Sequence, residues 1–185
     1  MLKRIGWVVV MGFLGIGIAQ ADEVKTNVVA PAQLDFAVKS TAAAADGPLP
    51  VMYTCDGANI SPQVSWSNDP SATESFALVL SDPDAPNGTF YHWIVYNIPK
   101  TVMKLEVSAA LPDGALAGKN SAGKMEYNGP CPPKGGSHHY VITVYALNTI
   151  LKLPAGADFN TLMTEMKDHI LTQADYRVVY SRWDK

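Results

Sequence analysis

The sequence predicts a mainly β, single-domain protein with one amphipathic helix near its C-terminus. Short apolar or alternating segments recur along the chain, and only one segment places its apolar residues at helical spacing. The 13 prolines and 14 glycines lie mostly between the predicted strands, which is typical of a β-rich fold with ordered loops. We find no internal repeat and no second domain boundary.

The predicted strands follow two patterns. The first strands alternate apolar with polar residues, which indicates one buried face, whereas the later ones are nearly continuous apolar or aromatic runs that suit a buried strand. In chain order, they cover residues 34–38, 62–66, 75–80, 90–98, 140–147 and, as a short last strand, 177–180.

The predicted helix begins after Asp158, whose carboxylate is a plausible N-cap. Its apolar residues recur at spacings of three and four, which places them on one helical face. They are Phe159, Leu162, Met163, Met166, Ile170 and Leu171. We interpret the methionines of this stripe as core-filling residues.

The first 21 residues have the layout of a secretory signal peptide. Lys3 and Arg4 precede an apolar run over residues 5–18, and the small-x-small pattern at 19–21 provides a cleavage site. A membrane anchor is the alternative, but about 14 apolar residues fall short of the roughly 20 that span a bilayer. We therefore predict a signal peptide at 1–21, a flexible lead-in at 22–33, and a periplasmic or secreted domain at 34–185 without a membrane span.

The charge of the chain excludes some partners. There are 14 basic and 17 acidic residues, for a net charge of −3, and cleavage would remove two of the basic ones. A mildly acidic protein without a Lys/Arg cluster is a poor ligand for nucleic acids or anionic lipid surfaces. Any anion that it binds must be held by local geometry.

The two cysteines, Cys55 and Cys131, predict one disulfide, because an even number in an exported protein favours pairing. Two free thiols are the alternative. Pairing would exclude Cys131 as a nucleophile, since an oxidised sulfur has no thiolate.

One chemically unusual segment precedes the predicted strand at 90–98, and another forms its first residues. The acidic, proline-rich segment 81–86 directly follows the preceding strand and should form a stiff corner. His92 lies near the start of the next strand, where we expect Ile94 and Tyr96 to share its face. Taken alone, the first reads as a solvated turn and the second as a core histidine.

A third segment is rich in proline and enters the strongest predicted strand through two histidines. Residues 127–133 read Tyr-Asn-Gly-Pro-Cys-Pro-Pro, and His138 and His139 precede Tyr140. Along a strand, His138 and Tyr140 share one face while His139 points to the other. The two rings therefore diverge, which argues against a metal site.

Taken together, these segments resemble the signature of the phosphatidylethanolamine-binding family, in its bacterial, Raf-kinase-inhibitor-like branch. The likeness covers about residues 34–182. Its motifs are Asp82-x-Asp84-Ala85-Pro86, His92-Trp93, Gly129-Pro130-Cys131-Pro132-Pro133 and His138-x-Tyr140, with support from Asn59-x-Ser61-Pro62, Trp66, residues 120–123 and 169–171.

The resemblance implies a β-sandwich-like domain with short peripheral helices and a shallow anion pocket at one end. It also implies a cis Ala85–Pro86 peptide. The implied ligands are phosphate, carboxylate or phosphorylated head groups. The implied ligand-binding residues are Asp82, Pro86, His92, Gly129, Pro130, His138 and Tyr140.

We expect a non-enzymatic binding protein that needs no cofactor or metal. In the pocket, Asp82 would orient one histidine, while imidazole N–H groups, the Tyr140 hydroxyl and backbone N–H groups near Gly129 would hold the anion. The resemblance allows a protein partner and a homodimer. The alternatives are a protease- or kinase-inhibitor role independent of the pocket, and a weak hydrolase that uses the Asp/His cluster.

Overall fold

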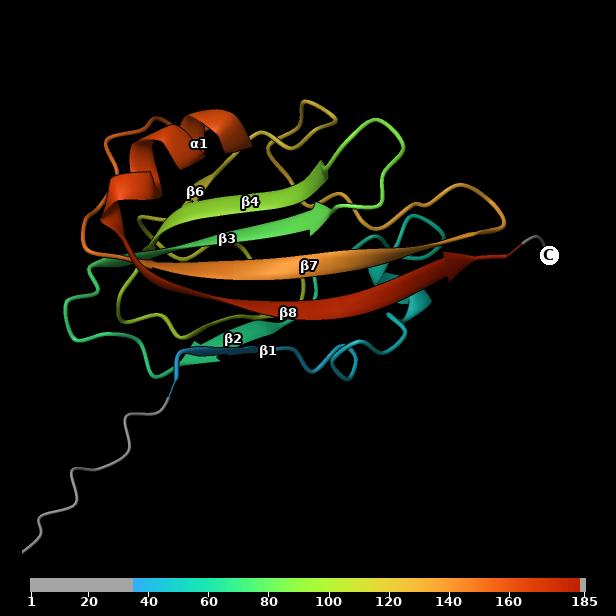
Figure 1. Cartoon of the computed structure of the whole chain (residues 1–185), viewed down its shortest axis with the longest axis horizontal. Coiled ribbons are helices and arrows are strands. Elements are labelled where there is room, and N and C mark those ends of the chain that lie inside the picture. Colours follow the sequence, from blue (N-terminus) through green and yellow to red (C-terminus); the bar gives the residue numbers. More distant parts are fainter. Residues whose placement is uncertain (1–34, 184–185) are drawn as a thin grey trace, which may run out of the picture. The chain divides into compact units, whose positions relative to one another are not determined.

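Two antiparallel sheets form the domain, and the computed structural model describes it over residues 35–183 (Figure 1). The predicted signal peptide and lead-in lie outside the described residues. The smaller sheet has the order β1 (Ala37–Lys39), β2 (Val64–Ser67), β5 (Lys104–Leu105). The larger has the order β6 (Leu116–Ala117), β4 (Phe90–Pro99), β3 (Ser75–Asp82), β7 (Gly136–Leu147), β8 (Ile170–Arg182).

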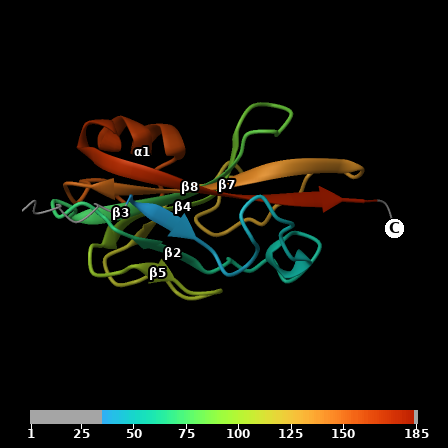
Figure 2. The same cartoon turned by 60° about the horizontal axis from the view of Figure 1, so that its bottom comes forward.

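The larger sheet is the middle layer of three, with the smaller sheet on one face and helix α1 (Phe159–Met166) on the other (Figure 2). Strand β3 shows why its sequence is a continuous apolar run. Leu78 and Leu80 pack into the core toward the smaller sheet, and Ala77 and Val79 pack into the core toward α1. Because both faces of β3 are buried over residues 76–80, this part of the strand carries apolar side chains at every position.

The structure confirms the mainly β, sandwich-like fold and refines its boundaries. The two-residue strands β5 and β6 were not predicted, and the peripheral helices are two 3-10 turns, η1 (Val51–Tyr53) and η2 (Lys167–His169). None of the helices between residues 35 and 183 is long and apolar enough to cross a membrane.

The helix prediction was right at its start and wrong at its end. The Asp158 carboxylate accepts the Thr161 backbone N–H at 2.8 Å, as expected of an N-cap. The helix ends at Met166, however, and Ile170 and Leu171 belong to β8. Strand β8 pairs with β7 along its whole length, from Gly136 opposite Arg182 to Leu147 opposite Ile170. This long-range pairing overrides the local helical spacing.

The predicted disulfide between Cys55 and Cys131 is present, with the two Cα atoms 5.5 Å apart. It joins the loop after η1 to the proline-rich loop before β7. The Cys55 backbone N–H also donates to the Pro130 carbonyl at 3.1 Å. The proline-rich loop is therefore fixed to the rest of the domain just beside the predicted pocket.

Candidate functional site

The ends of three neighbouring strands bring together four of the predicted site residues. Asp82 is the last residue of β3, His92 lies near the start of β4, and His138 and Tyr140 lie near the start of β7. Because β3 pairs antiparallel with both β4 and β7, the end of β3 and the starts of β4 and β7 lie at the same end of the sheet (Figure 1). We call Asp82, His92, His138 and Tyr140 the Asp–His cluster.

Asp82 holds His138 in one orientation. The His138 Nδ1–H donates to Asp82 Oδ2 at 2.7 Å, and the Asp84 backbone N–H donates to Asp82 Oδ1 at 2.9 Å. Asp82 is 4% exposed, so its carboxylate depends on these bonds in place of water. The bond to Nδ1 leaves His138 Nε2 to face a ligand.

A β-bulge turns His92 toward this cluster. Leu80 pairs with Trp93 and Ser81 pairs with Tyr91, so His92 has no partner on β3. The extra residue reverses the alternation of β4. His92 therefore meets Tyr140, with the ring centroids 5.3 Å apart, whereas Ile94 packs toward α1. The expectation that His92 shares a face with Ile94 and Tyr96 was wrong, because a bulge resets the side-chain period.

The proline-rich loop supplies hydrogen-bond partners to the bulged residue, His92. The Asn128 N–H donates to the His92 carbonyl at 3.0 Å, and His92 Nδ1–H donates to the Asn128 carbonyl at 2.6 Å. Sequence reasoning missed Asn128, because a backbone carbonyl leaves no signal in residue type.

Gly129 serves packing, and its N–H is already used. That N–H donates to Asn59 Oδ1 at 2.7 Å, so it is not one of the donors for an anion that we expected among the backbone N–H groups near Gly129. A Cβ at this position would lie 2.6 Å from both the Asn59 side chain and the Tyr53 carbonyl. Only glycine allows the loop to approach so closely. Asn59 was quoted in the motif but was not assigned to the site.

The two predicted prolines lie in different surroundings. Pro130 is buried in the wall formed by the proline-rich loop, whereas Pro86 is exposed in the turn between β3 and β4. Every peptide bond in the described part of the chain is trans, so the implied cis Ala85–Pro86 peptide was wrong.

The Tyr140 hydroxyl is the unusual atom of the cluster. Tyr140 is fully buried, and its hydroxyl has no hydrogen-bond partner of normal geometry among the described residues. The Asp82 side chain and the Cys131 backbone lie near enough to act on its ionisation as hydrogen-bonding groups, but neither contact reaches normal hydrogen-bond geometry. Buried polar groups are nearly always paired, so an unpaired one at the edge of a site indicates a missing partner.

Burial sets the charge states of the aromatic members. It lowers the pKa of His92, against the opposing effects of the Asn128 backbone bond and the Asp82 charge. It also raises the pKa of Tyr140, with a further contribution from the Asp82 carboxylate. Tyr140 therefore stays a neutral O–H donor, and His92 stays neutral to lower pH than an ordinary histidine.

His139 points away from the cluster, as the strand alternation predicted. Its backbone N–H and its Nδ1–H both donate to Asp84 Oδ2, at 2.8 and 2.7 Å. These bonds hold the pKa of Asp84 below its ordinary value. The pair is exposed, and its charges are screened by water.

The cluster opens to the surface beside His138. It is not lined by the same residues as four surface cavities of about 390 to 480 Å³ elsewhere on the described part of the domain. The His138 side chain is 12% exposed, which leaves a small opening. No group of three or more His, Cys, Asp or Glu side chains between residues 35 and 183 has the geometry to hold a metal ion.

A sequence profile described as phosphatidylethanolamine-binding protein matches residues 39–181, which include the whole cluster. The chain belongs to the phosphatidylethanolamine-binding protein family. The resemblance inferred from the motifs is thereby confirmed.

Relatives in this family agree in sequence and in fold. A UPF0098 protein of Methanothermobacter thermautotrophicus is 42% identical over 140 residues, which cover 74% of this chain and 92% of the relative. The putative lipoprotein LppC of Mycobacterium tuberculosis is 40% identical over 141 residues, which cover 76% and 69%. The crystal structure of Escherichia coli YbcL matches with a TM-score of 0.74 at 35% identity and covers 80% of this chain and 99% of YbcL.

Proposed function

We propose that this protein is an exported, non-enzymatic binding protein that holds a small anion, such as phosphate or a phosphorylated head group, at the Asp–His cluster. The observation that carries the proposal is the buried Tyr140 hydroxyl, which lacks a partner among the described residues. An anion oxygen is the partner that a neutral O–H donor at such an edge would take.

The histidines on either side support the same ligand. Both Nδ1 atoms are engaged, by Asp82 and by the Asn128 carbonyl, so both Nε2 atoms lie outside these bonds. A protonated Nε2 donates to an anion, and the carboxylate behind His138 compensates its imidazolium charge. Because burial keeps His92 neutral and its one ring proton is donated to Asn128, its Nε2 can only accept a hydrogen bond. We therefore assign the charged donor to His138 alone, and His92 can meet only a protonated oxygen of the ligand.

The low exposure of the cluster favours a small ligand group. The His138 side chain is 12% exposed and the Asp82 side chain 6%, so a small anionic group reaches them more easily than a bulky one. The chains of a phospholipid would then lie outside the cluster.

A binding role without catalysis fits the cluster better than hydrolysis. Cys131, in the adjacent loop, is oxidised and supplies no nucleophile. Export is consistent with the disulfide and with the lipoprotein name of one relative. A homodimer or a protein partner is compatible with this role.

Calorimetric titration with inorganic phosphate and with glycerol phosphate tests the proposal. We expect both ligands to bind, and the affinity to fall by about tenfold in a His138→Ala variant, which loses the charge-assisted hydrogen bond. Equal affinity in that variant would contradict the contact with His138, and no binding by the unaltered protein would refute the anion site. Turnover of p-nitrophenyl phosphate above that of a His138→Ala variant would refute the non-enzymatic role.

A further inference from the structure

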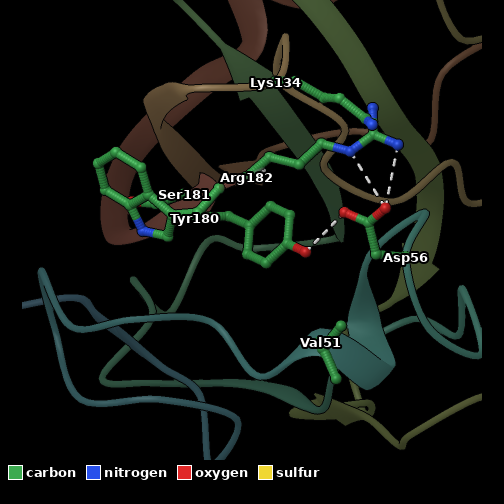
Figure 3. A pocket seen from close by; sticks show the side chains of 7 residues that line it. Val51, Asp56, Lys134, Tyr180, Ser181 and Arg182 are labelled. Atoms are coloured by element: carbon green, nitrogen blue, oxygen red, sulfur yellow. Dashed lines mark hydrogen bonds and ion pairs between the residues drawn. The ribbon is translucent and has the colours of Figure 1, made fainter. Parts of the chain in front are cut away.

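A second groove, of about 480 Å³, lies at the C-terminal end of β8 (Figure 3). Val51, Asp56, Tyr180, Arg182 and other residues line it. Tyr180 is paired with His138 across β7 and β8, so the groove adjoins the Asp–His cluster but shares none of its residues. We call it the β8 groove.

One wall of the β8 groove presents a guanidinium that is held in place. Arg182 Nε and Nη2 donate to Asp56 Oδ1 at 3.1 and 3.0 Å, and the Tyr180 hydroxyl donates to Asp56 Oδ2 at 2.8 Å (Figure 3). These contacts occupy both Asp56 oxygens but only two of the five guanidinium N–H groups. The remaining N–H groups can hold a second carboxylate in a fixed geometry.

Arg182 is the group of the groove that a carboxylate ligand would contact. Two of its N–H groups bond Asp56, and the others can donate to a second acceptor in charge-assisted hydrogen bonds. A ligand with an acidic side chain therefore suits this wall better than a neutral one.

The backbone of β8 is open where it enters the groove. Residues 46–49 cover the preceding part of this edge. The Asp46 N–H donates to the Arg177 carbonyl, and the Leu49 N–H donates to the Val179 carbonyl. Because backbone groups alternate along a strand, the N–H and C=O of Ser181 point the same way as those of Val179. Within residues 35–183, no other backbone group reaches Ser181 on that side.

Two apolar side chains complete the surface. Val51 is 54% exposed and Trp183 is 70% exposed, and both line the groove. The groove thus combines an open strand edge at Ser181, a fixed cation at Arg182 and an exposed indole at Trp183. Proteins bind extended peptides through such features, because the strand edge supplies backbone hydrogen bonds and the side chains supply specificity.

We propose that the β8 groove docks an extended segment of a partner protein that carries an acidic side chain. The segment pairs with the backbone at Ser181, its carboxylate contacts Arg182, and a neighbouring apolar side chain rests on Trp183. This site is independent of anion binding at the Asp–His cluster.

Fluorescence anisotropy with labelled six-residue peptides tests this site. One peptide alternates valine with glutamate, and its matched control replaces glutamate by glutamine. Because a hydrogen bond to a charged group contributes about 1.5–3 kcal/mol, we expect the glutamate peptide to bind at least about tenfold more tightly. Methylation of the peptide backbone nitrogens should weaken both.

Variants of β8 assign the effect to Arg182. Arg182→Gln should abolish the preference for glutamate. Arg177→Gln should retain it, although Arg177 also pairs with an aspartate, Asp46, at 3.2 Å on the same strand. Trp183→Ser removes an exposed side chain and should weaken both peptides without unfolding the domain.

Several results would overturn the proposal. These are equal binding of the two peptides, an equal loss in Arg177→Gln, or unchanged binding in Trp183→Ser. Displacement of the glutamate peptide by inorganic phosphate alone would assign the groove to a small anion and would equally overturn it.

Discussion

His138 donates its Nδ1–H to Asp82 across 2.7 Å, so a buried carboxylate stands behind the ring that is to meet an anion. Asp82 fixes the orientation of the His138 ring, and its negative charge would compensate a positive charge on that ring. The bond to Nδ1 leaves Nε2 for a ligand. The site can thus carry a positive charge in a domain that is acidic overall.

Loss of Asp82 should destabilise the fold. Asp82→Ala removes a buried acceptor of two hydrogen bonds, so we expect a loss of about 2–3 kcal/mol in the free energy of unfolding. Asp84→Ala is the matched control, because its bonds to His139 are exposed and should contribute less than about 1 kcal/mol. Urea denaturation measures both. Similar losses of stability in the two variants would show that the buried hydrogen bonds of Asp82 contribute no more than the exposed ones of Asp84.

The Tyr140 hydroxyl should matter for binding and not for stability. Tyr140→Phe removes a hydroxyl with no partner among the described residues, so stability should be unchanged or slightly higher while phosphate affinity falls about tenfold. Tyr176→Phe is the control, because the Tyr176 hydroxyl donates to the Ala43 carbonyl at 2.6 Å. That variant should lose about 1 kcal/mol of stability and keep its phosphate affinity. The opposite pattern would exclude Tyr140 from the site.

Burial of His92 predicts a dependence of stability on pH. Its folded-state pKa lies below its ordinary value of 6.5, because burial disfavours the charged ring. Below pH 6.5 the unfolded chain binds more protons at this residue than the folded chain. The free energy of unfolding therefore decreases as the pH falls below 6.5, and this loss is absent at higher pH. Urea denaturation at about pH 5 and about pH 7.5 should show this loss, and His92→Gln should reduce it.

His169→Gln is the control for this measurement, because His169 is only half-buried and its ring nitrogen bonds the Asn148 side chain at 2.9 Å near the surface. It should keep the full pH dependence. If His92→Gln retained the same loss between the two pH values, the buried-histidine explanation would fail.

The disulfide should support the site as well as the fold. Cys55 and Cys131 fix the loop whose Asn128 binds His92 through two hydrogen bonds. Replacing both cysteines by serine should cost about 2–5 kcal/mol of stability and should also weaken phosphate binding at temperatures where the variant is folded. Calorimetry on the folded variant checks this. Unchanged affinity would show that the loop holds its position without the bridge.

The sequence predicted what local patterns encode. The buried run of β3, the N-cap of α1, the opposite directions of His138 and His139, and the cysteine pairing all follow from residue type and spacing. Each depends on neighbouring residues or on a simple count, and the family motifs then identified the residues of the cluster.

The features that were missed depend on pairing between distant segments. The polar strand β8 forms because β7 offers a partner along its length, a fact that its own residues do not show. The bulge at His92 and the engagement of Gly129 by Asn59 are likewise set by backbone contacts between loops. The contact with Asn59 removes the Gly129 N–H from the expected donors of the site, whereas the Tyr140 hydroxyl stays among them.

A crystal structure of the protein grown with selenate at about pH 5.5 tests the proposed anion site most directly, because selenium gives an anomalous signal and selenate, like phosphate, is a tetrahedral oxyanion. We expect an anomalous peak whose oxygens lie within hydrogen-bond distance of the Tyr140 hydroxyl and His138 Nε2. An anomalous peak elsewhere, with only water beside Tyr140, would contradict anion binding at the Asp–His cluster.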